Sequence, residues 1–411
     1  MKSAMQNSEK RWFIAVMATL VHLCLGTVYA WSFFQKTVSE TFGWSNSETA
    51  WAFSLAIFML GVTASWGGQN LQKFGPRKLA LIGAFLYAFG YIISYFALQN
   101  ESLWLLYFGY GIVGGIGLGL AYVTPVATVS KWFPDKQGLV TGMVVMGFGL
   151  GALLMSKLLA PIFLEYFEKD LAKTFLAIGI TLLVLLPFFA NFLNLPTEEK
   201  STEISAEKLS ATKEILSPNF IFIWLIFMFN VVAGMIFISF QSPLLQDLLK
   251  AENVNIDTAT LEKSGATLIA ISALFNGLGR FFWGSISDKL GRVTTFRLLL
   301  LIEMGVFASL IFIKSPILFS VGVCLILLSY KGGFGFLLSL IKNFFCTELM
   351  SIVYASEITA WGVGGILGPQ ITAYMKDHFA ENAGLFAYKV ALVLIALGIG
   401  LSFFVKNKKA Q

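Results

Sequence analysis

The stretch NGLGRFFWGSISDKLGR (276–292) joins the end of an apolar segment to a short polar turn bounded by glycines. A related stretch, GVTASWGGQNLQKFGPRK, occupies residues 61–78, at an offset of 216 residues. At that offset three glycines and a lysine coincide: Gly61 with Gly277, Gly68 with Gly284, Gly75 with Gly291 and Lys73 with Lys289. Self-similarity at a fixed offset is the mark of a duplicated structural unit, so the chain is predicted to consist of two related halves.

The composition is that of a membrane protein. Of the 411 residues, 57% are hydrophobic and 13% are charged, whereas soluble domains carry about 25% charged residues. The apolar residues form long runs with few charges, which is typical of membrane-spanning helices. A large soluble all-α protein is the alternative, and this composition argues against it.

About twelve apolar spans are predicted, six on each side of the polar stretch PTEEKSTEISAEKLSATKEILS (196–217). We therefore expect an all-α membrane protein with an N-terminal six-helix bundle (1–195), a cytoplasmic linker (196–217) and a C-terminal six-helix bundle (218–411). With an even number of spans both termini lie on one side, and 18 of the 29 Lys and Arg residues fall in the loops and ends on that side, against nine on the other. The positive-inside rule then predicts that both termini are cytoplasmic. Basic residues confined to short loops also argue against nucleic acid binding.

The repeated turn resembles the signature loop of the major facilitator superfamily, Gly-x-x-x-Asp-Arg/Lys-x-Gly-Arg/Lys. The second copy is intact, with Gly284, Asp288, Lys289, Gly291 and Arg292, while the first copy has Gln72 in place of the acid. The resemblance implies two pseudo-symmetric six-helix bundles and secondary transport by alternating access.

More narrowly, the chain resembles the oxalate/formate antiporter branch, which includes bacterial monocarboxylate (lactate-type) transporters. Five segments carry this resemblance: RWF at 11–13, GTVYAWSFF at 26–34, KWFPDKQGLVTG at 131–142, NGLGRFFWGSISDKLGR at 276–292 and TAWGVGGILGP at 359–369. The branch implies a small-carboxylate substrate and a bacterial inner (plasma) membrane location.

Arg280 is the most informative single residue. An arginine inside a span costs several kcal/mol unless it faces a wet cavity or a partner. Its repeat equivalent is Ala64, so the fold does not need this charge in both halves. A guanidinium pairs bidentately with a carboxylate, and in the resembled branch the arginine at this position binds the substrate carboxylate; pairing with a structural acid is the alternative. Asn276, one helical turn away, is predicted to bind substrate, to orient Arg280 or to hold two helices together.

Lys331 interrupts the tenth span, where the family usually has a small residue. Two interpretations stay open: a structural ion pair with Glu303, which reaches a similar depth, or a second positive charge in the cavity. Trp361 stands where the oxalate-exchanging member of the branch has a lysine. If Lys331 does not substitute for that lysine, one cationic anchor remains, which favours a monocarboxylate such as lactate or formate over a dicarboxylate.

Tyr29, Tyr122 and Tyr330 lie at positions where the resembled family lines its cavity with aromatic residues, so they are predicted to line the site; packing or interface anchoring is the alternative for each. Glu357 is predicted to form a salt bridge at the cytoplasmic rim or to take part in proton coupling.

Four residues of the repeated turns are predicted to control opening: Gly68, Gly284, Asp288 and Arg292. In the superfamily the acid of this turn helps to hold the two halves together on the cytoplasmic side, partly by facing a helix N-terminus. Dense glycines in the fourth, fifth and eleventh spans suit helices that pack closely and slide. A phosphate-binding glycine loop is the alternative, but no Walker lysine follows these glycines.

The predicted function is secondary transport of a small carboxylate anion, with a proton as a possible co-substrate and exchange or symport as the mechanism. An oxalate/formate-type dicarboxylate exchanger and a carrier of another small solute are the alternatives. The three cysteines and two histidines are scattered, so no metal or other cofactor is predicted, and the spans lack the clustered catalytic groups of an intramembrane enzyme. The expected partners are the small anion and the lipid bilayer, without nucleic acid; the sequence predicts no oligomeric state.

Overall fold

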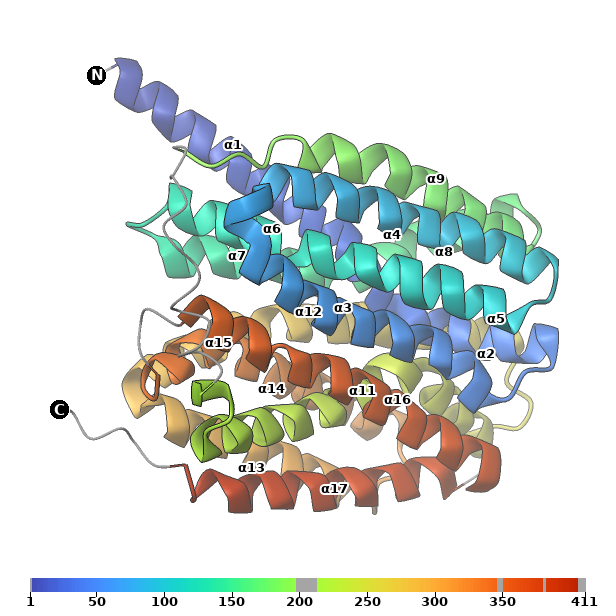
Figure 1. The fold of residues 1–411 in the computed structure, drawn as a ribbon. Coiled ribbons are helices and arrows are strands. Elements are labelled where there is room, and N and C mark those ends of the chain that lie inside the picture. The colour runs from blue at the N-terminus through green and yellow to red at the C-terminus, as the bar shows by residue number, and fades with distance from the viewer. Residues whose placement is uncertain (1, 197–212, 346–349, 380–381, 406–411) are drawn as a thin grey trace.

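The computed structural model describes residues 2–196, 213–345, 350–379 and 382–405. All regular secondary structure in this part of the chain is helical. The helices form two groups that lie one above the other in Figure 1, with the first half in blue to green and the second half in yellow-green to red. Helix α1 begins, and helix α17 ends, on the same side of the molecule, here called the terminal face. The far side is called the opposite face.

The first half contains six membrane-length segments, three of which are interrupted by a short change of helical pitch. Their elements are α1 (Lys2–Leu25), η1 (Gly26–Ala30), α2 (Trp31–Phe42), α3 (Asn46–Phe74), α4 (Pro76–Gln99), α5 (Leu103–Leu106), η2 (Tyr107–Gly114), α6 (Gly115–Trp132), α7 (Gln137–Leu154), η3 (Met155–Leu159), α8 (Ala160–Tyr166) and α9 (Leu171–Ala190). The first segment therefore runs through α1, the 3₁₀ turn η1 and α2, and η1 brings Tyr29 to the interface between the halves.

The second half begins with two long helices and ends with one that closes the bundle. Its elements are α11 (Pro218–Glu252), α12 (Thr258–Leu290), α13 (Arg292–Leu310), α14 (Pro316–Lys342), α15 (Met350–Glu357), α16 (Thr359–Phe379) and α17 (Ala383–Ser402). Most of the predicted linker, residues 197–212, lies outside the described residues.

Eleven helical segments in the described part of the chain are long and apolar enough to cross a membrane. The eleventh in the predicted order of spans, α16, has 21 residues but a sequence diluted by glycine, proline and glutamine, TAWGVGGILGPQITAYMKDHF. It nevertheless packs lengthwise against α3 and α11, so it takes its place as a full member of the second bundle. The prediction of an all-α protein with twelve transmembrane helices in two six-helix bundles is confirmed.

The sequence repeat reappears as a repeat of backbone geometry. Gly75 ends α3 and precedes α4 with φ +75° and ψ 153°, and Gly291 ends α12 and precedes α13 with φ +83° and ψ 150°. Side-chain-bearing residues avoid this region because the Cβ atom collides with the backbone. The two turns are therefore the same structural device, used once in each half.

The outer surface carries many exposed apolar side chains, an arrangement that is unfavourable in water. Exposed side chains include Val184, Ile180 and Val393, which are 65%, 50% and 59% accessible. Extended apolar surface on long apolar helices matches the acyl chains of a bilayer. The chain is thus an integral, multi-pass membrane protein.

Two crossings of glycine on glycine bring the halves together. A Cβ atom added to Gly61 of α3 would lie 2.7 Å from the backbone nitrogen of Gly362 in α16, and one added to Gly149 of α7 would lie 2.8 Å from Cα of Gly277 in α12. Gly61 and Gly277 are the partners found by the sequence repeat, so the two crossings are pseudo-symmetric. Backbones that approach this closely leave room for no side chain.

Candidate functional site

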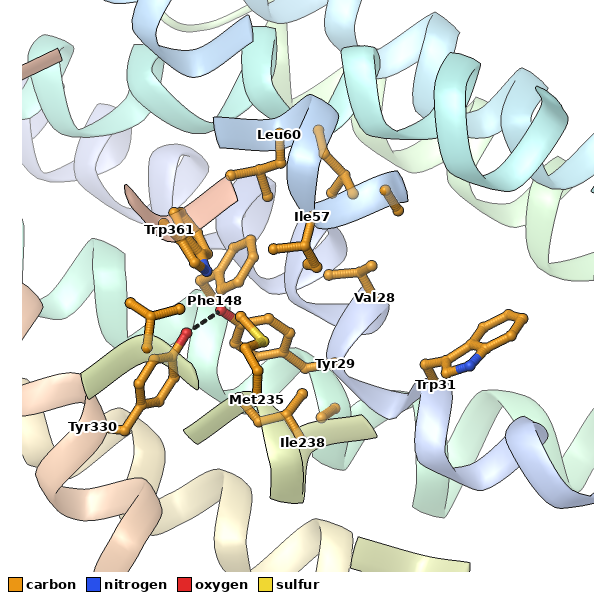
Figure 2. Close-up of a cluster of buried hydrophobic side chains, with 14 of the residues drawn as sticks. Val28, Tyr29, Trp31, Ile57, Leu60, Phe148, Met235, Ile238, Tyr330 and Trp361 are labelled. Atoms are coloured by element: carbon orange, nitrogen blue, oxygen red, sulfur yellow. Dashed lines mark hydrogen bonds between the residues drawn. The ribbon is translucent and has the colours of Figure 1, made fainter. Parts of the chain in front are cut away.

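Aromatic side chains from both halves meet between these crossings and form what we call the aromatic box: Tyr29, Tyr122, Phe148, Tyr330, Phe334 and Trp361. Figure 2 shows Tyr29 of the first half and Tyr330 of the second half pointing toward each other, with Phe148 and Trp361 beside them. The two hydroxyl oxygens are 3.1 Å apart and share a hydrogen bond. Both phenols are buried, so the box is closed to bulk water in this conformation.

The ammonium group of Lys331 lies inside this box. Its Nζ atom donates hydrogen bonds to the hydroxyl oxygens of Tyr29, at 2.8 Å, and of Tyr330, at 3.3 Å. It also lies 4.2 Å from the ring centroid of Phe334 and 4.8 Å from that of Trp361. Cation–π contacts and hydroxyl oxygens replace part of the lost hydration, but neither supplies a negative charge.

Arg280 reaches the same box from α12. Its guanidinium carbon lies 5.5 Å from the Phe334 centroid, and one of its nitrogens is 3.5 Å from the Tyr122 hydroxyl oxygen, the outer limit of a hydrogen bond. The side chain is 6% exposed. Within the described residues, neither Arg280 nor Lys331 has a carboxylate within 4 Å. Two buried cations therefore share one aromatic enclosure without a counter-ion.

Tyr122 is held in place from behind. The ring of His22 stacks on it, with centroids 4.9 Å apart and planes 15° from parallel, and Nε2 of His22 lies 2.9 Å from the backbone oxygen of Tyr122. His22 is fully buried and packs behind the wall of the box.

Trp361 offers an additional donor. Its indole N–H is buried and interacts with the Tyr330 hydroxyl, without a hydrogen bond of regular geometry. In Figure 2 the indole nitrogen is turned toward the paired hydroxyls of Tyr29 and Tyr330. A buried N–H normally finds a well-placed acceptor, so an anion in the box could improve on this contact.

A small space adjoins the box on the side of the opposite face. Its free volume is about 10 Å³, roughly what one water molecule needs, and it is lined in part by Tyr29, Gln241, Ser272 and Asn276. Ser272 donates a hydrogen bond to the side-chain oxygen of Gln241, at 2.7 Å, while the side-chain oxygen of Asn276 has no partner among the described residues. Sites for drug-sized ligands are far larger, roughly 300–1,000 Å³, so in this conformation the space has room for little more than water.

The two buried acids of the second half lie apart from the cations. Oε1 of Glu303 accepts a hydrogen bond from the side-chain amide of Asn230, at 2.9 Å, and Lys331 contacts hydroxyls and rings instead. Of the two interpretations of Lys331, the ion pair with Glu303 is not formed, and Lys331 faces the aromatic box. Glu357, at the end of α15, is buried, and its two oxygens have no partner among the described residues, so within that part of the chain it forms no rim salt bridge.

The residues predicted to control opening lie at the terminal face, away from the box. Asp288 is 67% exposed at its side chain and pairs with Arg292 in its own turn, at 2.5 Å. A Cβ atom added to Gly68 would lie 3.6 Å from the Cβ atom of Ala355 in α15, an ordinary contact, whereas one added to Gly284 would meet nothing within 4 Å. In this conformation Asp288 is bonded within the second half, and among the described residues it has no ion pair across to the first.

Five predicted residues converge on the box or its edge: Arg280, Lys331, Tyr29, Tyr122 and Tyr330; Asn276 lines the adjoining space. Sequence reasoning missed Phe148 and Phe334 as cation neighbours. With 40 phenylalanines in the chain, no single one stands out, although Phe334 follows Lys331 by three positions and so faces the same way on α14.

Two bundles that enclose a buried, cation-bearing site between them define a membrane transport protein. The chain belongs to the Major Facilitator Superfamily, whose sequence profile matches residues 12–369.

Two similar proteins are named as carriers of carboxylates, and one solved transporter structure shares the fold. The chain is 26% identical over 400 residues to the oxalate:formate antiporter of Oxalobacter formigenes, covering 96% of this chain and 91% of that protein. It is 29% identical over 156 residues to monocarboxylate transporter 14 of Mus musculus, covering 38% of this chain and 30% of that one. The fold also matches the crystal structure of a bacterial homologue of the human lysosomal transporter Spinster in an inward-facing conformation, with a TM-score of 0.70 at 15% identity over 96% of this chain and 97% of that one.

Proposed function

We propose that this protein is a secondary transporter of a small carboxylate anion, which it carries by alternating access of one central site. The observation that carries the proposal is the pair of buried cations, Arg280 and Lys331, without a carboxylate partner in the described part of the chain. Uncompensated buried charges cost several kcal/mol, and an anion that binds between them removes that cost.

Carboxylate chemistry fits the donors of the box. The guanidinium of Arg280 presents parallel N–H groups that match the two oxygens of a carboxylate. The buried indole N–H of Trp361 and the hydroxyls of Tyr29 and Tyr330 add neutral polar groups. A monocarboxylate such as lactate or formate and a short dicarboxylate such as oxalate both belong to this class.

The proposal includes the membrane in which the protein lies and its orientation there. The excess of Lys and Arg on the side of the termini, 18 against nine, supports a bacterial inner membrane protein with both termini cytoplasmic. The division into bundles at 1–195 and 218–411, joined by a linker at 196–217, likewise remains a prediction. If a proton accompanies the anion, uptake should depend on an imposed pH gradient.

The test is solute uptake by purified protein in proteoliposomes. Labelled lactate, formate and oxalate are offered singly and in competition, to the wild type and to Arg280→Gln, with and without a pH gradient. We expect uptake or exchange of at least one carboxylate by the wild type and a loss of about a hundredfold or more in the variant, the size expected when one partner of a buried charge contact is removed.

A matched control separates binding from folding. Arg297→Gln removes an arginine from the same bundle, where it bonds to Ser402 far from the box, and should transport normally if it folds. Uptake of no carboxylate by well-folded wild type contradicts the proposed function.

A further inference from the structure

Both cations of the site lie over one aromatic ring. The guanidinium carbon of Arg280 is 5.5 Å, and Nζ of Lys331 is 4.2 Å, from the centroid of Phe334. The separation of the two charges therefore cannot exceed the sum of these two short distances. A diacid of two or a few carbons can bridge such a gap, with one carboxylate directed to each cation.

Lys331 is not engaged in a structural ion pair. Its hydrogen-bond partners are the phenol oxygens of Tyr29 and Tyr330, and the nearest acid by depth, Glu303, is bonded to Asn230. Phenol oxygens are weaker acceptors for an ammonium group than a carboxylate is. They hold the cation in position while leaving its charge to be neutralised by a ligand.

Charge balance then discriminates between ligands. A monoanion bound to Arg280 leaves Lys331 buried and uncompensated, whereas a dianion neutralises both groups. No acid among the described residues of the box supplies the missing charge. The expectation of a monocarboxylate depended on a single anchor, because Trp361 replaces the lysine of the oxalate-exchanging relative. Lys331, from a different helix, is placed to supply the second anchor. The expectation of a monocarboxylate then no longer holds.

Resting on the proposed function, we infer that Lys331 is a second anion anchor, which sets the charge preference of the site and selects short dicarboxylates over monocarboxylates. The carboxylate that reaches Lys331 takes over from the Tyr29 hydroxyl as its principal acceptor. The ring of Phe334 and the indole of Trp361 then cover the ion pair and exclude water.

The experiment compares wild type, Lys331→Met and Lys389→Met in proteoliposomes and in ligand-induced thermal shifts. Methionine fills the space of the lysine stem without its charge, so the buried box should stay packed. Lys389 is the control, since its ammonium lies 5.4 Å from the centroid of Phe386 on α17, a cation–π contact outside the box. The probes are oxalate, malonate, formate and lactate, each measured for affinity and for competition.

We expect the wild type to prefer oxalate to lactate, and Lys331→Met to lose at least about tenfold in oxalate affinity while the affinities for formate and lactate change by less than about threefold. Oxalate should raise the unfolding temperature of the wild type and of Lys389→Met, but not that of Lys331→Met. If Lys331→Met weakens monocarboxylates and dicarboxylates alike, or neither, or if the wild type prefers lactate, the inference is wrong while carboxylate transport stands. Binding of no carboxylate by the wild type overturns the proposed function and the inference together.

Discussion

The carboxylate of Asp377, at the end of α16, caps the N-terminus of α3 by accepting a hydrogen bond from the backbone N–H of Ser47, at 2.8 Å. Its other oxygen accepts from the backbone N–H of Asn46, also at 2.8 Å. A carboxylate at a helix N-terminus is favoured by the unpaired N–H groups and by the helix dipole. Because α16 belongs to the second half and α3 to the first, this cap ties the halves together at the opposite face, where Lys36 of α2 also bonds Gln246 of α11 at 2.8 Å.

Replacing Asp377 by Ala should loosen the opposite face. Loss of a helix cap costs about 1 kcal/mol, and here the lost bonds also join the halves. We expect a lower unfolding temperature and greater reactivity of a single cysteine placed near Ser47 toward an impermeant thiol reagent. Asp257→Ala is the control, because Asp257 caps α12 through Thr260 within one half. It should lower stability without changing that reactivity; equal reactivity in both variants would show that Asp377 is only a cap.

The Asp377 cap should also depend on pH. Burial tends to raise the pKa of Asp377, but the hydrogen bonds from Ser47 and Asn46 outweigh it and hold the pKa below the usual value of the group. A carboxyl with a lowered pKa stabilises the folded state fully above its unfolded pKa of about 4 and loses that contribution as the pH falls through the folded value. The difference in unfolding temperature between wild type and Asp377→Asn should be constant from about pH 7 to 5 and shrink below about pH 4. A difference that grows on acidification contradicts this assignment.

The glycine crossings should not tolerate even a methyl group. Gly149→Ala places Cβ 2.8 Å from Cα of Gly277, and Gly61→Ala places it 2.7 Å from the nitrogen of Gly362. We expect each variant to lose most transport and about 1–3 kcal/mol of stability, the usual cost of overpacking. Gly400→Ala, with nothing within 4 Å of the added atom, should be neutral or slightly stabilising because alanine favours helix. Normal transport by both crossing variants would mean that the halves can separate there at no cost.

The repeated turns should respond alike to one substitution. Gly75→Ala and Gly291→Ala force a side chain into a region of positive φ and extended ψ that only glycine normally adopts, so each should destabilise by about 1–3 kcal/mol. Chemical or thermal unfolding of the two variants in detergent provides the measurement. A large cost at one turn and none at the other would contradict their structural equivalence.

Much of the architecture could be predicted because membrane helices obey strong local rules. The lengths of the apolar runs predicted the spans. The offset between Gly75 and Gly291 predicted the duplication, and the two turns have matching backbone angles. Arg280 could be identified as a site residue because an arginine within an apolar span is costly unless it has a partner or faces a polar cavity. Tyr29, Tyr122 and Tyr330 required the family resemblance, since isolated tyrosines on apolar helices are usually packing.

Other parts of the site could not be predicted, because depth along a helix says nothing about direction around it. Lys331 and Glu303 lie at similar depths, yet one faces the interface of the halves and the other faces Asn230 within its own bundle. Asp377 reads as an ordinary acid at a helix end, and only the tertiary arrangement brings it to Ser47. Phe148 and Phe334 carry no sequence signal that distinguishes them from phenylalanines facing lipid.

Arg280 and Lys331 both belong to the second half, so the charge of the site is carried by one of the two moving bodies. In a membrane at 100 mV, each elementary charge that crosses the whole field changes its energy by about 2.3 kcal/mol, and proportionally less for a fraction of it. An empty carrier changes its exposure with both charges bare, whereas a carrier loaded with a dianion does so with the site neutral. With the proposed dicarboxylate as substrate, voltage should therefore act mainly on the unloaded return and little on the loaded step.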